Sequence, residues 1–188
     1  MQERALLQPF ILERMQENTE TDQQFTTIFE TYYKRIYNYI AYRVSCRYTA
    51  EDLTSLVFEK TLSKLDSFSG EKAPFEVWLF AIARNVVNDY YRSRKRTRLF
   101  SLDTVMELVS GKKAPEDLLL EEERNTRLNH ALNKLAVKER NVVALKFGAG
   151  LKNKEIALLT GISESNVGVI LYRSMRKLKS EIGSVDEL

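Results

Sequence analysis

Apolar residues recur at steps of three and four positions along much of the chain, which is the spacing of one face of an α-helix. The first clear run follows Asp22 and consists of Phe25, Ile28, Phe29, Tyr32, Ile36 and Ile40. Residues 1–20 have a weaker pattern. We therefore predict a first helix from Asp22, preceded by an N-terminal extension that is either frayed or a short helix.

A second helix is predicted to begin at Thr49, because Thr49 followed by Asp52 is a variant of the capping box. It should extend to about Leu65. Its predicted buried side consists of Leu53, Val57 and Leu62.

Ser67, Ser69 and Gly70 interrupt the helical pattern, and Pro74 suits the first turn of a third helix. The apolar side of this helix consists of Phe75, Trp78, Leu79, Ile82, Val86 and Tyr90. The helix continues directly into a basic segment. Three amphipathic helices with a shared aromatic core predict a first domain over residues 21–99.

Residues 100–116 lack a sustained period and contain Gly111 and Pro115, so they are interpreted as a linker with a short helix near 105–109. Apolar periodicity resumes after the linker. Its markers are Leu128, Leu132, Leu135, Val142, Val143 and Leu145. The sequence thus predicts an all-α protein, with a second helical domain over residues 117–188.

Composition narrows the class of protein. The net charge is only +3, but cations cluster in Arg92–Arg98 and Arg173–Lys179, and clustered cations favour a nucleic-acid partner. A single cysteine excludes an internal disulfide, and no apolar run reaches the roughly 18 residues of a membrane span. One histidine and the absence of a phosphate-binding glycine loop argue against a metal, a cofactor or catalytic residues. We expect a cytoplasmic, non-enzymatic protein.

The strongest motif is a helix-turn-helix over Lys154–Arg173. Ala157 gives the close contact between two steeply crossed helices, Gly161 gives the turn, and Ser163 caps the second helix. The second helix has an inner stripe of Val167, Ile170, Leu171, Ser174 and Leu178. Its predicted DNA-binding residues are Ser165, Asn166, Val169, Tyr172, Arg173 and Arg176, with Lys177 as a further phosphate contact. A helical hairpin without a DNA role is the weaker alternative.

The third helix of the first domain has a second candidate surface. Arg84, Asn88, Tyr91 and Lys95 follow one another at steps of four, three and four residues, so they share one side. Cations bind phosphates, amides read bases and aromatic rings stack on unpaired bases. For this helix taken alone, a solvated basic face is the simpler interpretation.

Two blocks of sequence resemble the extracytoplasmic-function sigma factors of the sigma-70 family. The first contains Ala50–Lys60, Phe75–Asn85 and Asp89–Arg92, and the second runs from Leu132–Arg140 through the helix-turn-helix to Leu178. Together they span nearly all of the chain from Phe25 to Leu178. The resemblance implies a subunit that binds core RNA polymerase and directs promoter recognition, melting and transcription initiation.

The resemblance also implies residue roles. The residues that would bind the clamp helices of the largest polymerase subunit are Glu51, Asp52, Leu53, Ser55, Phe58 and Glu59. Those that would take the minus-ten promoter element are Arg84, Asn85, Asn88, Tyr91, Arg92 and Lys95, with the loop Ser67–Lys72 capturing a flipped base. The helix-turn-helix would read the minus-thirty-five element. Further implied partners are the polymerase flap and an anti-sigma factor, which we expect near an exposed apolar stripe at Leu56 and Phe58.

The chain departs from the family at Gly168, Val169 and Ile170, where relatives usually have polar or basic residues. We therefore expect a more apolar readout of the upstream element. Two other functions stay open at this point. A dimeric helix-turn-helix regulator would bind its operator without polymerase, and a DNA-processing enzyme would need an acidic metal cluster that the sequence does not offer.

Overall fold

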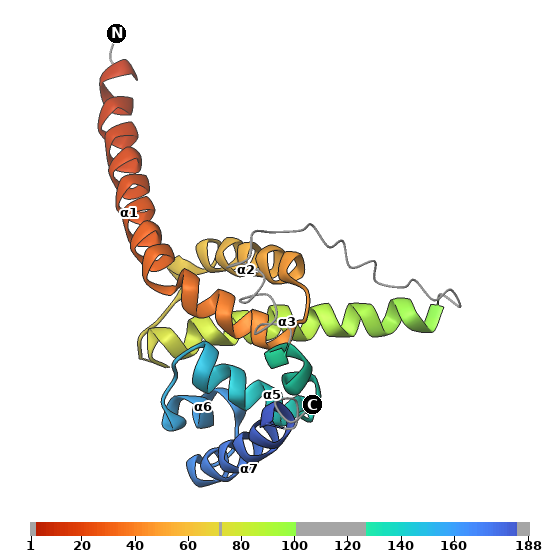
Figure 1. The fold of residues 1–188 in the computed structure, drawn as a ribbon. Helices are drawn as coiled ribbons and strands as arrows, with labels where there is room; N and C mark the ends of the chain where they lie inside the picture. The colour runs from red at the N-terminus through yellow and green to blue at the C-terminus, as the bar shows by residue number, and fades with distance from the viewer. Residues whose placement is uncertain (1–2, 72, 101–126, 184–188) are drawn as a thin grey trace, which may run out of the picture. The chain divides into compact units, whose positions relative to one another are not determined.

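The computed structural model describes residues 3–71, 73–100 and 127–183, and the regular elements in these ranges are all helical (Figure 1). The predicted linker and its short helix near 105–109 lie outside the described residues. The elements are α1 (Glu3–Arg43), α2 (Arg47–Leu62), η1 (Leu65–Ser67), α3 (Phe75–Phe100), α5 (Val137–Val143), η2 (Ala144–Gly148), α6 (Asn153–Thr160) and α7 (Glu164–Gly183). The all-α prediction is confirmed. The chain divides into two compact units, Met1–Lys34 and Arg35–Leu188.

Helix α1 begins at Glu3, well before the predicted start at Asp22. The segment before Asp22 is rich in glutamate, glutamine, leucine and arginine, which have high helix propensity and continue a helix without a strong apolar stripe. The weak period of residues 1–20 was therefore a poor guide to their backbone conformation. In the Met1–Lys34 unit, the rings of Phe29 and Tyr33 lie one helical turn apart in a tilted arrangement, with 5.1 Å between their centroids.

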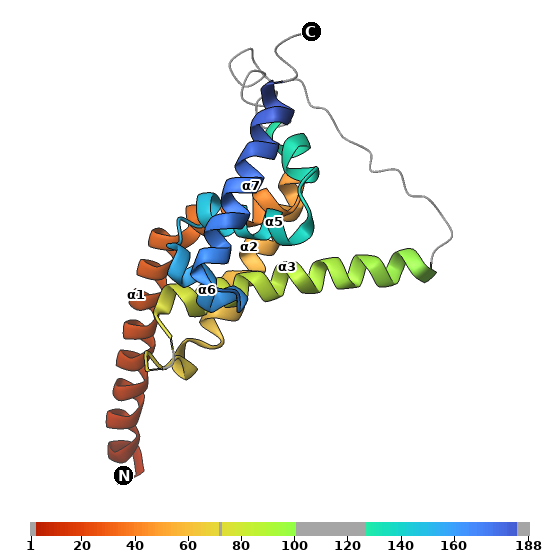
Figure 2. The same ribbon diagram turned by 90° about the horizontal axis from the view of Figure 1, so that it is seen from below.

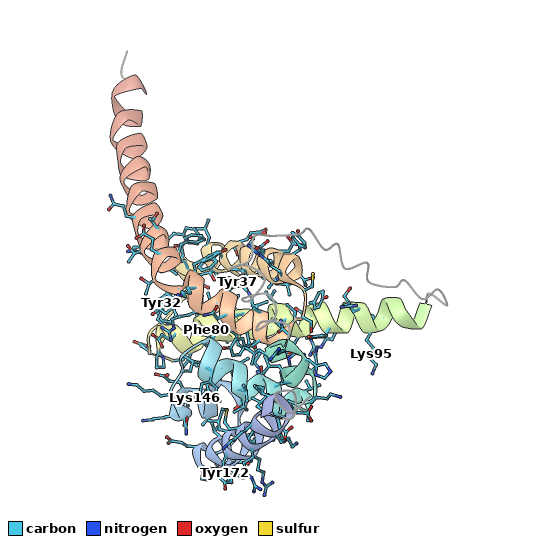
Figure 3. The ribbon with its side chains drawn as sticks, in the orientation of Figure 1. Tyr32, Tyr37, Phe80, Lys95, Lys146 and Tyr172 are labelled. Atoms are coloured by element: carbon cyan, nitrogen blue, oxygen red, sulfur yellow. The ribbon has the colours of Figure 1, made fainter. Side chains whose placement is uncertain are left out.

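Within the Arg35–Leu188 unit, the end of α1 packs with α2 and α3 around a hydrophobic core. The largest fully buried side chains of this group are Ile36, Tyr39, Ile40, Val57, Leu79, Phe80 and Val87. The ring of Phe80, labelled in Figure 3, packs edge to face against the ring of Tyr39, with 6.0 Å between the ring centroids. The predicted core residues Leu53, Val57, Leu79, Ile82 and Val86 are buried. Leu62 is 43% exposed, contrary to prediction, because it is the last residue of α2.

Helix α2 begins at Arg47, so Thr49 is not its cap. Cys46 takes the N-cap position in an extended conformation without a capping side chain. Inside the helix, the buried hydroxyls of Thr54 and Thr61 donate to the carbonyls of Ala50 and Val57, at 2.7 and 2.8 Å. These bonds remove the cost of burying two polar groups.

Residues 127–133, α5, η2, α6 and α7 form a second helical group in the same unit (Figure 2). Its fully buried side chains include Leu132, Val142, Leu145, Leu151 and Ile156. Helices α5 and α6 both start without a serine cap: the backbone N–H groups of Ala136 and Lys152 donate to Glu139 and Glu155, at 3.0 and 2.7 Å. This carboxylate is the returning half of a capping box. Asn153 is the first residue of α6.

Candidate nucleic-acid interface

The helix-turn-helix has the predicted geometry. Gly161 ends α6 with φ of +73°, and its N–H donates to the carbonyl of Ala157 at 2.9 Å. Such a φ is readily reached only by glycine. The Ser163 hydroxyl accepts the Asn166 N–H at 3.3 Å, which caps the start of α7. Val167 is fully buried and Leu171 nearly so. The turn and the inner stripe therefore fix which side of α7 faces outward.

The six predicted DNA-binding residues of α7 are all exposed to solvent: Ser165, Asn166, Val169, Tyr172, Arg173 and Arg176. Tyr172 and Val169 are 66% and 46% exposed, and Figure 3 shows Tyr172 on the outer side of the helix. Met175, which the sequence pattern missed, is also exposed on α7. The surface combines cations at its C-terminal half with apolar groups in its middle, which suits phosphates and thymine methyl groups.

Lys177 differs from its neighbour Arg176. Its ammonium group donates to both carboxylate oxygens of Glu139 on α5, at 2.7 and 2.9 Å. The bond from Lys177, helped by the Ala136 N–H, holds the pKa of Glu139 below its usual value. Lys177 thus joins α7 to α5, and its predicted role as a phosphate contact is not supported by this arrangement.

The candidate surface of α3 is only partly open. Asn85, Arg92 and Lys95 are exposed, and Lys95 extends from the helix in Figure 3. Arg84 is half-buried and donates to the carbonyl of Leu159 at 3.2 Å. The Tyr91 hydroxyl donates to the carbonyl of Arg43. Tyr91 is nevertheless 39% exposed, whereas the guanidinium of half-buried Arg84 is held by a contact with α6.

A cationic hollow lies where α2 and α3 meet. Its lining residues are Lys60, Lys64, Ile82, Asn85, Asp89 and Arg92. Asp89 accepts a hydrogen bond from Arg92 at 3.1 Å, which orients the guanidinium group of Arg92. Sequence periodicity missed Lys60 and Lys64. Their spacing of four residues near the end of α2 was the available signal, but it did not show that α2 ends beside Asn85 and Arg92.

The residues predicted to bind polymerase fall into two groups. Asp52, Ser55 and Glu59 are exposed on α2, and Glu51 is half-exposed and paired with Arg47 at 2.9 Å. Leu53 and Phe58 are buried, at 8% and 3% exposure. They belong to the core that holds α2, and the expected exposed apolar stripe at Leu56 and Phe58 is absent at Phe58. Tyr48, missed by the pattern, is 69% exposed on the first turn of α2.

Neither a metal site nor a membrane span is found in the part of the chain that the structure describes. In that part, no three histidine, cysteine, aspartate or glutamate side chains group closely enough to hold a metal ion. Likewise, none of the described helices combines the length and apolar character needed to cross a bilayer.

Each of the two helical groups matches a known protein family. Residues 28–97 match the model of sigma-70 region 2, and residues 126–178 match that of sigma-70 region 4. These two matches identify a protein of the sigma-70 class. The chain belongs to the extracytoplasmic-function sigma factors of that family.

Several relatives are similar over most of the chain. The extracytoplasmic-function sigma factor BldN of Streptomyces coelicolor is 33% identical over 154 residues, covering 82% of this chain and 58% of BldN. SigD of Mycobacterium tuberculosis is 31% identical, covering 71% of this chain and 63% of SigD. The chain thus spans about three fifths of the length of these two relatives. Sigma factor RpoE of Bartonella quintana, solved with the anti-sigma factor NepR, shares the fold with a TM-score of 0.70 at 22% identity, covering 86% of this chain and 98% of RpoE.

Proposed function

We propose that this protein binds core RNA polymerase and directs promoter recognition, promoter melting and transcription initiation. The observation that carries the proposal is the exposed outer face of α7, the second helix of the helix-turn-helix. The same chain also has a basic surface in its region 2 domain. Polymerase supplies the bond chemistry, so this chain needs no catalytic residue, cofactor or metal. Its place of action is the cytoplasm.

Helix α7 reads the minus-thirty-five element from the major groove. Ser165 and Asn166 stand at its N-terminal end, where side chains reach base edges. Val169 and Tyr172 form an apolar middle that suits thymine methyl groups, and Arg173 and Arg176 bind flanking phosphates.

The surface of α3 takes the minus-ten element. Asn85, Asn88, Arg92 and Lys95 contact the strands, joined by Arg84 and Tyr91 once they leave their internal partners. Lys60 and Lys64 add phosphate contacts from α2. The loop after η1 captures a base flipped from the melted strand. Unstacking that base costs a few kcal/mol, which these contacts must offset.

Helix α2 is the contact with the polymerase clamp helices. The exposed polar groups of Asp52, Ser55 and Glu59 line one side, while buried Leu53 and Phe58 anchor that helix from behind. The helix-turn-helix domain also binds the polymerase flap. An anti-sigma factor is a further partner, as the RpoE relative was solved with one.

Run-off transcription tests the proposal. Purified core polymerase is given linear genomic promoter fragments with and without this chain. Promoter-dependent transcripts should appear only when the chain is present. No transcript from any promoter, together with a stable dimer that binds DNA without polymerase, would instead identify a self-sufficient regulator.

A further inference from the structure

Gly168 lies in the middle of α7, where the fold gives no reason for a glycine. Its φ is not positive, so its backbone would accept alanine. Among the residues that the structure describes, a methyl group added to Gly168 would meet no atom within 4 Å beyond its own helix backbone. By contrast, Gly150 and Gly161 have positive φ, and a methyl group on Gly148 would lie 2.9 Å from the backbone of Tyr39. Since glycine is one of the poorest helix formers, Gly168 weakens α7 and calls for a reason outside the fold.

The space that Gly168 leaves open adjoins the predicted DNA-binding residues of α7. Ser165 lies one turn before Gly168 and Tyr172 one turn after it, and both are exposed. Residues three and four positions apart are neighbours on the surface of a helix. Ser165 is itself small, and its hydroxyl lies 3.3 Å from the hydroxyl of Ser163 at the start of the helix. We call this space, between Ser165 and Tyr172, the Gly168 notch.

The chemistry of the Gly168 notch favours an apolar group of the DNA. In the interior of a helix, the N–H and C=O groups of Gly168 are taken by the helix's own hydrogen bonds. Glu164, exposed one turn earlier on the same side, has a carboxylate that would repel a phosphate. Val169 and Tyr172 add exposed apolar surface beside the notch. The apolar group that DNA presents in its major groove is the C5-methyl group of thymine.

We infer that the Gly168 notch receives the C5-methyl group of one thymine in the upstream promoter element, which makes Gly168 a specificity-determining residue. The inference rests on the proposed function, because it requires α7 to read that element. It gives the missing side chain a purpose: an alanine methyl group at position 168 would occupy the space of the thymine methyl group.

Removing a methyl group from the DNA and adding one to the protein probe the same space. Holoenzyme is tested in competition binding on a promoter in which each thymine of the upstream element, on either strand, is replaced in turn by deoxyuridine. This change removes only the C5-methyl group. The wild-type chain should lose affinity by about fourfold at one position, as expected for one buried methyl group. Gly168→Ala should lose more than this on the thymine promoter, because two methyl groups compete for one space. On the promoter with deoxyuridine at that position, it should bind as well as the wild-type chain.

Two further measurements separate base reading from helix stability. The melting temperature of Gly168→Ala should rise by about 2–4 °C, because alanine is the better helix former. Ser180→Ala is the matched control, since it places alanine at an exposed position near the end of α7, away from the notch. Its preference for thymine over deoxyuridine should equal that of the wild-type chain.

A wild-type chain that binds every deoxyuridine promoter as well as the thymine promoter would overturn the inference without any variant. An equal loss for Gly168→Ala on the thymine and deoxyuridine promoters would overturn it too. So would a lowered melting temperature, which would assign the glycine to the fold. If the wild-type chain forms no promoter complex with polymerase at all, the proposed function fails, and the inference fails with it.

Discussion

The recognition helix α7 and the basic helix α3 present their functional residues in different ways. The outer face of α7 is exposed along its length, and its orientation is fixed by Gly161 and the buried Val167. On α3, Arg84 and Tyr91 are bound to carbonyls of other helices. Reading duplex DNA needs a rigid helix that is already aimed. Arg84 and Tyr91 would first have to leave these carbonyls before their polar atoms could contact DNA.

The largest effect is expected at the turn that aims α7. Gly161→Val places a β-branched residue at φ of +73°, which costs about 1–3 kcal/mol of stability and changes the angle between α6 and α7. Upstream promoter binding should be lost, although the region 2 core stays folded. Footprinting of the holoenzyme measures it. Retained protection of the minus-thirty-five element would mean that the turn does not aim α7.

Next comes base reading by Asn166 at the exposed start of α7. Asn166→Ala should reduce discrimination against a changed base in the upstream element by about 1–3 kcal/mol at one position, as expected for a lost amide–base contact. Competition binding of the holoenzyme to single-base promoter variants measures this. Equal losses at every position would indicate a backbone contact instead.

Arg176 and Lys177 give a matched pair of cations on α7. Arg176→Ala should lower the slope of log affinity against log salt by about 1, because one phosphate contact is lost. Lys177→Ala should change the slope less, since that ammonium group is held by Glu139. Titrations of holoenzyme on promoter DNA at several salt concentrations compare them. Equal changes would show that Lys177 leaves Glu139 on DNA.

Two substitutions of Tyr91 distinguish its contact within the protein from its expected contact with DNA. Tyr91→Phe removes the hydroxyl bonded to the Arg43 carbonyl and should cost about 0.5–1.5 kcal/mol of stability. The ring remains, so promoter melting should continue, whereas Tyr91→Ala should impair melting as well. Urea unfolding and permanganate reactivity of the melted strand measure the two effects. Loss of melting in Tyr91→Phe would give the hydroxyl a direct role.

Features that depend on residues close together in the sequence were predicted correctly, whereas contacts between distant residues were not. The helix-turn-helix depends on spacing within twenty residues, so Gly161, Ser163 and four residues of the inner stripe were correctly placed, while Ile170 is only half-buried. The polymerase-binding role of Phe58 was implied by the family resemblance, but the residue is only 3% exposed, because it lies on the side of α2 that belongs to the core. The hydrogen-bond partner of Arg84, the carbonyl of Leu159, lies 75 positions away in the sequence. No local pattern encodes such contacts.

The smallest expected effect concerns how the stability of the folded protein depends on pH. It compares the two residues that join α5 to α7, Glu139 and Lys177. The hydrogen bond from Lys177 keeps the pKa of Glu139 low in the folded protein. The unfolded chain, with an ordinary carboxyl pKa, binds a proton more readily, so stability rises with pH in this range. The stability that Glu139 contributes is complete above the ordinary glutamate pKa, and it is lost as the pH falls through the lowered pKa of Glu139. Glu139→Gln should flatten this part of the stability curve measured by urea unfolding between pH 3 and 6, a range set by the ordinary pKa of about 4.3. Lys177→Met should flatten it only in part, because the Ala136 N–H still favours the carboxylate. An unchanged pH slope in both variants would mean that the Lys177–Glu139 pair does not persist in solution.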